Sequence, residues 1–283
     1  MKITVNTPTL IALAVGVLFS IGPMTVQADI NDGLIGAWTF DDGKVTDSIG
    51  QNHGKLFKGA KIVNKGKFGK ALDVDGSADT RVEIEVKDLD KFFEEAFTFS
   101  VWLFVRNGVD HSAVVWKGEK IGWGANFTFR LATTSNTSVT WGTTQGGEEC
   151  WFATENTIEP GKWFNLVQTV DGKEAIGYIT EEGGKTEIPI SGQANPRICA
   201  APYNLFPDRP IELGAGRAVG GNVGNDAFLD GMIDDLFIWD RALSEEEVEA
   251  LGAEERPEKA LSVKAHGKLA TTWGKVKSYN RMR

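Results

Sequence analysis

The sequence predicts an all-β fold, a two-sheet antiparallel jelly-roll sandwich with one short helix near the C-terminus. Three observations predict it. Short runs rich in β-branched and aromatic residues recur along the chain, turn residues separate them about every eight to twelve positions, and a single segment has helical signals. A chain of 283 residues, 41% of them hydrophobic, suits one large β domain or two small ones.

The clearest expected strand is 97–105, "FTFSVWLFV". Its alternation predicts that Phe97, Phe99 and neighbouring odd positions face the core, and that Trp102 faces the other, often concave, surface. The remaining expected strands are 34–40, 80–86, 113–117, 127–133, 138–144, 162–170, 175–180, 211–216 and 232–239. In "SEEEVEALG", Ser244 is the expected N-cap, Glu247 completes a capping box, and Gly252 is the expected residue after the helix.

Residues 1–28 have the features of a secretory signal peptide. Lys2 supplies the positive charge, 10–21 is an apolar run, and Val26-Gln27-Ala28 is a small-residue cleavage site. The alternative is an uncleaved anchor, but the run is short for a membrane span. We therefore expect a secreted or extracytoplasmic protein, with no transmembrane segment in the mature chain and a domain over 29–252.

The charge is acidic overall and basic at the C-terminus. Without Lys2 there are 29 basic and 39 acidic residues, a net charge of −10, which disfavours nucleic acid as a partner. Residues 256–283 have eight basic side chains and one acidic one, hence +7. We expect a linker and basic tail over 253–283. The tail could fold back on the domain, bind an anionic cell surface or stay solvated, and the alternation around His266-Gly267 favours a docking hairpin.

Cys150 and Cys199 are the only cysteines. In an exported chain, two cysteines more often form a disulfide than a metal site, so we expect a bridge between them. The alternative is two buried free thiols.

Asp234 and Asp235 interrupt the apolar run of 232–239. Strict alternation aligns Asp234 with Leu236 and Ile238, and Asp235 with Phe237 and Trp239. A carboxylate on an apolar face needs a partner. Capping of nearby backbone N–H groups is one expectation, and a hard cation is the other.

Several blocks resemble laminin G-like jelly-roll domains of the concanavalin A-like lectin/glucanase superfamily. The blocks are "GLIGAWTFDDGKVTDSIGQNHGKL", "GKFGKALDVDGSADTRVEI", "FTFSVWLFV", "GKWFNLVQTVDG" and "DGMIDDLFIWDRALSEEEVEAL", in the family's order over about 33–251. The resemblance implies adjacent first and last strands and frequent sugar and calcium binding. The segment "YITEEGGK" and the insertion "QANPRICAAPYNLFPDRP" depart from the family's pattern, so ligand choice does not carry over.

The resemblance yields a candidate calcium site. If the first and last strands pair, Asp41 or Asp42 approaches Asp234, and Asp47 in the turn "TDSIGQNHG" is a third oxygen donor. The expected ion is structural. The alternative is an Asx-turn at Asp47 and backbone hydrogen bonds to Asp234.

Tryptophans beside an arginine predict a sugar-binding surface. An indole stacks on a sugar ring while Arg or Asn binds its hydroxyls. The candidate ligand-binding residues are Trp102, Trp123, Arg130, Trp141 and Trp151. For any one of these tryptophans, core filling is the alternative. We assign Trp38, Trp163 and Trp239 to packing.

We therefore expect a secreted, non-catalytic binding module, a lectin or adhesion domain whose partner is an extracellular glycan or a cell-surface or matrix component. The alternatives are a glycoside hydrolase or polysaccharide lyase of the same superfamily, and a purely structural protein-interaction domain. Catalysis has little support, because Glu83 and Glu85 do not fit the carboxylate spacing of family-16-like enzymes on this fold. No catalytic residue is assigned.

Overall fold

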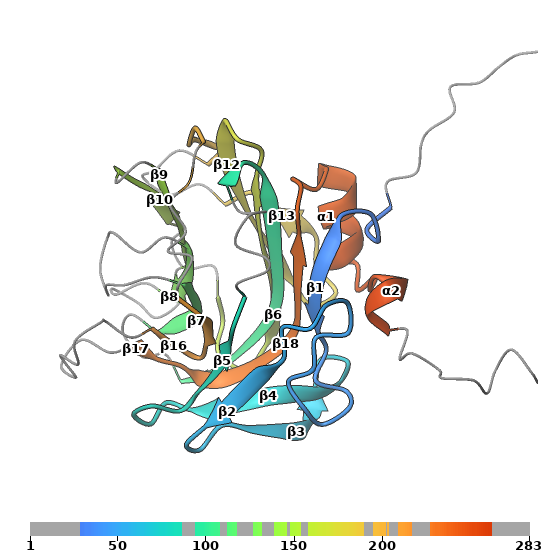
Figure 1. The fold of residues 1–283 in the computed structure, drawn as a ribbon, viewed down its shortest axis with the longest axis vertical. Coiled ribbons are helices and arrows are strands. Elements are labelled where there is room, and N and C mark those ends of the chain that lie inside the picture. Colours follow the sequence, from blue (N-terminus) through green and yellow to red (C-terminus); the bar gives the residue numbers. More distant parts are fainter. Residues whose placement is uncertain are drawn as a thin grey trace, which may run out of the picture.

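The fold is a sandwich of two antiparallel sheets in a computed structural model of the chain (Figure 1). The structure describes residues 29–86, 94–107, 112–117, 127–131, 139–145, 148–153, 158–189, 195–201, 203, 209–216 and 227–261; for 127–131, 139–145, 148–153 and 227 it describes the backbone alone. The expected signal peptide, the end of the basic tail and Trp123 lie outside these residues. Within them, no helix is long and apolar enough to cross a membrane.

The larger sheet has nine strands, in the order β13-β12-β11-β6-β18-β4-β3, with β1 paired to β18 and β14 to β12. Its strands are β1 (Leu34–Trp38), β3 (Lys61–Gly66), β4 (Gly69–Asp75), β6 (Phe97–Asn107), β11 (Trp163–Val170), β12 (Glu174–Glu181), β13 (Thr186–Glu187), β14 (Arg197–Ile198) and β18 (Asp230–Trp239).

The smaller sheet has seven strands, in the order β10-β9-β8-β7-β15-β5-β2. They are β2 (Gly54–Phe57), β5 (Arg81–Ile84), β7 (Ala113–Lys117), β8 (Phe127–Leu131), β9 (Val139–Gln145), β10 (Glu148–Ala153) and β15 (Ile211–Leu213). A separate pair, β16 (Ala215–Gly216) and β17 (Ala227–Phe228), lies beside β7. The expected all-β sandwich is confirmed.

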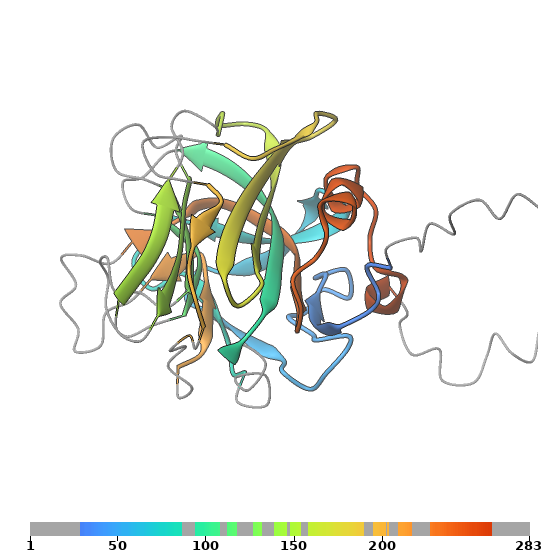
Figure 2. The same ribbon diagram turned by 90° about the horizontal axis from the view of Figure 1, so that it is seen from above.

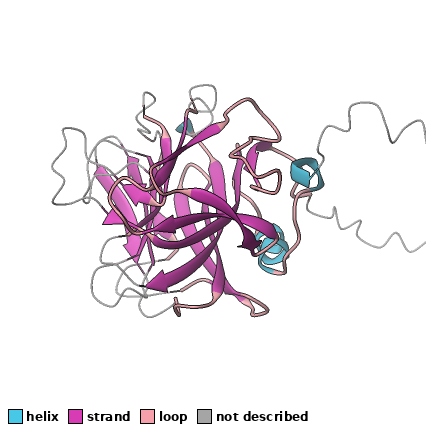
Figure 3. Cartoon of the chain, turned by 90° about the horizontal axis from the view of Figure 1, so that it is seen from below, coloured by secondary structure: helices cyan, strands magenta, loops and turns pink. Residues whose placement is uncertain are grey.

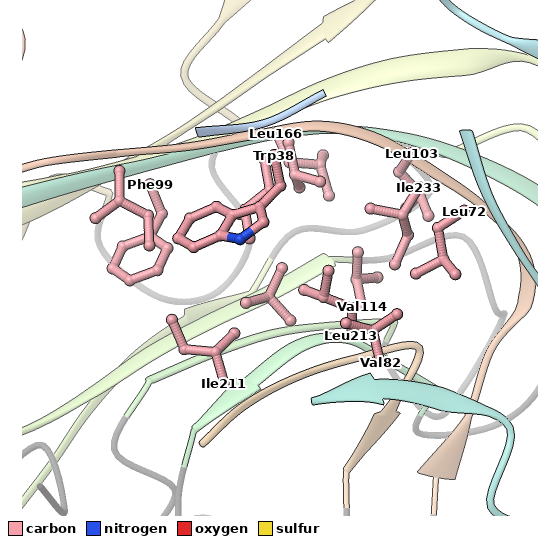
Figure 4. Close-up of a cluster of buried hydrophobic side chains, with 14 of the residues drawn as sticks. Trp38, Leu72, Val82, Phe99, Leu103, Val114, Leu166, Ile211, Leu213 and Ile233 are labelled. Atoms are coloured by element: carbon pink, nitrogen blue, oxygen red, sulfur yellow. The ribbon is translucent and has the colours of Figure 1, made fainter. Parts of the chain in front are cut away.

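The main core fills the space between the two sheets. In Figure 4, Phe99, Leu103 and Ile233 from the nine-stranded sheet face Val82, Val114 and Leu213 from the seven-stranded sheet. The predicted alternation of β6 is confirmed, since Phe97, Phe99, Val101 and Leu103 all belong to this cluster. Trp38 and Trp239 are fully buried and Trp163 is nearly so, as expected for packing residues.

Two short helices cover the outer face of the nine-stranded sheet, α1 (Glu245–Gly252) and α2 (Glu258–Leu261) (Figures 2 and 3). The capping box of Ser244 and Glu247 is present as predicted. Gly252, however, is the last helical residue rather than the residue after the helix. A Cβ there would lie 2.5 Å from Thr180 Oγ1, so glycine permits close packing of α1 on β12.

The segment 253–261, the start of the expected linker and tail, packs on the sandwich. Ala260 is buried in a second apolar cluster with Trp239, Val248 and Leu251. Lys259 donates to Asn31 through its backbone N–H and its Nζ. The chain therefore stays packed on the sandwich as far as Leu261.

Candidate functional site

The two central aspartates lie in a β-bulge where β18 changes partners. Asp230–Ile233 pair with β4, whereas Leu236–Trp239 pair with β1. Against β6, Asp234 pairs with Trp102 and Phe237 with Ser100, so one extra residue is inserted. Asp235 has a φ of 47°, a backbone conformation that aspartate tolerates better than most residues. Strict alternation therefore predicts the wrong face for Asp234. Leu236 and Ile238 lie in the core, whereas Asp234 lies on the outer face with Trp102.

Asp235 is fully buried and forms a bidentate ion pair with Arg256. Arg256 Nε lies 2.5 Å from Asp235 Oδ2, and Nη2 lies 2.6 Å from Oδ1 and 3.1 Å from Asp41 Oδ2. The guanidinium also lies over the Phe68 ring, 4.9 Å from its centroid. A cation from the C-terminal segment thus neutralises the buried carboxylate.

Asp234 is satisfied by backbone donors. Its Oδ2 accepts from Phe68 N at 2.9 Å, and its Oδ1 accepts from Asp235 N at 2.9 Å. Asp41 Oδ1 accepts from Lys70 N at 3.2 Å. The carboxylates of Asp234 and Asp41 therefore hold the β3–β4 turn and the start of β4 in place. They do so at the bulge of β18, where neither β1 nor β4 forms backbone pairs.

Trp102 does not form an open sugar platform, because it is 3% exposed. Phe68 packs edge-on against its ring, and Lys67 Nζ lies 4.9 Å from the ring centroid. Lys67 in turn binds Glu182 at 2.5 Å and Glu254 at 2.6 Å. The β3–β4 turn and the C-terminal segment together cover this face, so Trp102 is a packing residue.

Burial raises the pKa of Asp234 to about 8, and the charge of Asp235 adds to the shift. Burial also raises the pKa of Asp235 to about 7, while the hydrogen-bonded Arg256 opposes the rise. Because Arg256 forms a bidentate ion pair with Asp235 and not with Asp234, it favours the ionised form of Asp235. Because both values lie above the ordinary aspartate value, the folded chain holds protons that the unfolded chain releases, and stability falls as pH rises from about 4 to about 8.

Asp47 has no free side for a cation. Its Oδ1 accepts from the backbone N–H groups of Ala37, Ile49 and Gly50, and its Oδ2 accepts from Asn52 N and Nδ2. This is the Asx-turn alternative. Among the described residues, no group of three or more His, Cys, Asp or Glu side chains is placed to hold a metal ion. The donor set of Asp41, Asp47 and Asp234 does not fit a shared calcium ion, since backbone N–H groups and Arg256 occupy these carboxylates.

The seven-stranded sheet has one continuous cross-strand row on its outer face. Successive pairings align Trp151, Gly142, Thr128, Trp116, Glu212, Glu83 and Lys55. Arg130 lies two residues from Thr128 in β8 and so belongs to the same face. Trp141 pairs with Phe129, which in turn pairs with the core residue Val115. Trp141 therefore belongs to the alternate face of the sheet. Backbone register thus separates Arg130 and Trp151 from Trp141.

The described side chains of this row form a charged network beside a tryptophan. Arg81 donates to Glu83 Oε1 from Nε at 2.8 Å, and its Nε lies 3.6 Å from Glu212 Oε1. Glu212 and Trp116 are both nearly fully buried. Trp116 Nε1 has no hydrogen-bond partner within the part of the chain that the structure describes. An indole, a guanidinium and two carboxylates therefore form a mostly buried network within this part of the sheet.

The sequence prediction missed Arg81, Glu212 and Arg256 as site or supporting residues. Strand 80–86 and strand 113–117 were recognisable, but the register that brings Glu83, Glu212 and Trp116 together was not. Arg256 was counted with the basic tail. The available signal was its position, since it follows the predicted helix directly and could neutralise Asp234 or Asp235 in the apolar strand before that helix.

The bridge between Cys150 and Cys199 stays a prediction, because the side chain of Cys150 lies outside the described residues. Cys199 is fully buried next to β14, and β10, which includes Cys150, lies against β14. The backbone placement is compatible with a bridge.

Residues 75–249 match the family profile Laminin_G_3, which is described as the Concanavalin A-like lectin/glucanases superfamily. The chain belongs to this superfamily. The comparison confirms the resemblance of the sequence blocks and agrees with the two antiparallel sheets. A search of the curated proteins finds no match.

Solved structures of similar fold include a domain of an arabinanase and the binding domains of two toxins. One is domain 4 of AbnA, a GH43 extracellular arabinanase from Geobacillus stearothermophilus, solved in complex with arabinotriose. It is 18% identical to this chain with a TM-score of 0.54, and the match covers 77% of this chain and 98% of that one. The binding domain of Paraclostridial Mosquitocidal Protein 1 is 18% identical (TM-score 0.56; 79% and 52% covered). The binding domain of Botulinum Neurotoxin DC in complex with SialylT is 12% identical (TM-score 0.54; 80% and 52%). This superfamily member spans about half of each toxin domain. At these identities the likeness shows the fold alone.

We expect Arg256→Ala to lower the free energy of unfolding by about 3–5 kcal/mol, because it leaves Asp235 buried without a cation. Chemical denaturation measures the change. Lys162→Ala, at an exposed ion pair with Glu181, is the matched control and should cost less than about 1 kcal/mol. The double variant Asp235→Asn/Arg256→Met should recover part of the loss. Equal costs for Arg256→Ala and Lys162→Ala would contradict the assignment.

Asp234→Asn should reduce the pH dependence of stability. The wild-type chain should lose stability between pH 4 and pH 8 as Asp234 and Asp235 ionise, and the neutral amide removes the share of that loss that belongs to Asp234. Thermal melts at intervals across this range measure it. A wild-type chain that gains stability as pH rises through this window would refute the assigned protonation of Asp234.

Proposed function

We propose that this chain is an exported, non-catalytic carbohydrate-binding module, and that its ligand lies on the outer face of the seven-stranded sheet. The observation that carries the proposal is the backbone register, which brings Arg130 and Trp151 onto one face of β8, β9 and β10. Trp116 and Glu212 lie in the same cross-strand row but are buried, so they support this face from within rather than contact the ligand. Stacking on an indole and hydrogen bonds from a guanidinium bind the two kinds of surface that a sugar ring offers.

The opposite face supports the proposal by exclusion. The outer face of the nine-stranded sheet is covered by Phe68, Lys67 and Arg256, and its Trp102 is buried. Two structures of similar fold support a glycan ligand, since the AbnA domain is solved in complex with arabinotriose and the neurotoxin domain in complex with SialylT. The partner we propose is an extracellular glycan or a glycosylated cell-surface or matrix component.

Export and the disulfide complete the proposal. The signal features of residues 1–28 support secretion, and an oxidising compartment would allow Cys150 and Cys199 to form their bridge. The bridge would join β10 of the proposed binding face to the segment that follows β14.

A hydrolase of the same superfamily is the second candidate, because Glu83 and Glu212 lie directly opposite each other on neighbouring strands. Glycosidases use two carboxylates that flank the scissile bond. Here Arg81 lies between the two carboxylates as their shared cation, which favours a structural or ligand-positioning network over an acid–base pair.

Trp151→Ala and Arg130→Ala should each lower the affinity for a bound glycan by at least about tenfold, since each removes a contact on the binding face. A glycan array that includes arabinotriose identifies the ligand, and isothermal titration calorimetry measures the affinity. Trp141→Ala is the matched control because it removes an indole from the alternate face of the same sheet. It should change affinity less than Trp151→Ala does.

Two results would contradict the proposal. Absence of binding to every glycan would favour a protein-interaction domain. Release of reducing sugar that is lost in Glu83→Gln or Glu212→Gln would favour the hydrolase.

A further inference from the structure

A cavity of about 320 Å³ lies between the loop after β1 and the C-terminal segment. Its lining residues are Thr39, Asp41, Asp42, Thr46, Asp47, Ser48, Gly50, Gln51, His53, Ala260 and Leu261. It is separate from the row on the seven-stranded sheet, with which it shares no residue. Its volume is at the lower end of the range for small-molecule sites, so it suits a small ligand.

Both walls of the cavity are held in place by hydrogen bonds. The five donors on Asp47 fix the loop, and Ser48 Oγ donates to Ala260 O at 2.9 Å. Lys259 N donates to Asn31 Oδ1 at 3.0 Å and anchors α2. The cavity is therefore preformed from two segments that are some 200 residues apart in sequence.

The polar groups of the lining offer both donors and acceptors. His53 Nδ1 accepts from Asp47 N at 3.1 Å, so the proton of the neutral ring is on Nε2, which leaves that nitrogen as a donor. Asp42 accepts from Lys44 N and Thr46 Oγ1, and an ionised carboxylate has lone pairs for about two more donors. A hydroxylated ligand can use both kinds of group.

The charges exclude other classes of ligand. Among the lining residues that the structure describes there are three aspartates and no lysine or arginine, which disfavours an anion. An organic cation is disfavoured because Arg256 already binds Asp41, at 3.1 Å, and because a cation cannot accept from His53. Ala260 and Leu261 offer apolar contact for the C–H face of a sugar ring.

We propose that this cavity is a second binding site, and that it takes one neutral sugar ring or a polyol of similar size. The site extends the proposed function but does not depend on the seven-stranded face. Loss of ligand binding at one site would therefore not imply its loss at the other.

The test is saturation-transfer NMR on the full chain with D-glucose, D-galactose, L-arabinose and myo-inositol, and with tetramethylammonium as a cationic probe. Leu261→Trp should fill the cavity, since Leu261 lines it and is 42% exposed, so the larger side chain does not enter the core. His53→Ala removes the donor. Each variant should lower the signal of the bound sugar at least about fivefold, a change expected when a contact of a small ligand is lost.

Ile198→Trp is the matched control, at a position 87% exposed on β14, and Trp151→Ala is the control for the other site. Ile198→Trp should leave the signal unchanged. In the Trp151→Ala background, which removes the other site, the cavity signal should remain and Leu261→Trp should lower it. The proposal is overturned if no neutral sugar or inositol binds the wild-type chain, if binding in the Trp151→Ala background survives Leu261→Trp, if Trp151→Ala abolishes all binding, or if tetramethylammonium alone binds. Glycan binding that Trp151→Ala abolishes, with no sugar in the cavity, would leave the proposed function standing and remove this site.

Discussion

The ion pair between Asp235 and Arg256 is the interaction on which the arrangement of the molecule depends. β18 is the central strand that must change partners from β4 to β1, and a bulge at Asp234 and Asp235 makes the change possible. The bulge leaves a carboxylate fully buried, which only a desolvated cation can balance. That cation comes from beyond α1, so the C-terminal segment has to pack on the sandwich for the central strand to be stable.

The two sheets consequently have different outer faces. On the nine-stranded sheet, Arg256 and Lys67 bring the β3–β4 turn and the C-terminal segment over Trp102. On the seven-stranded sheet, polar and aromatic residues line up across strands, with Arg81 between Glu83 and Glu212. The first face stabilises the fold through burial and ion pairs, and the second offers groups that suit a hydroxylated ligand.

Much of the fold follows from local pattern. The alternation of 97–105, the capping box at Ser244 and the pairing of the first and last strands were all predictable, because each depends on residues close in sequence or on family order. The faces of Asp234 and Asp235 were not, since a bulge shifts the alternation by one residue. The burial of Trp102 depends on Phe68 and Lys67, which no pattern in 97–105 reveals. The three aspartates predicted to bind calcium do not form a fitting site, for a related reason. Backbone N–H groups, some of them distant in sequence, occupy the carboxylate oxygens that the ion would need.

The central claim is that the nine-stranded face is closed and that ligand binding belongs to the seven-stranded face. Hydrogen–deuterium exchange with and without a saturating glycan tests it most directly, because exchange reports where backbone amides become protected. The account predicts new protection in 127–153, across β8, β9 and β10, and unchanged exchange in 61–75 and 245–261. Protection confined to 61–75 and 245–261 would show that the ligand binds over Phe68 and Arg256, and would contradict the account.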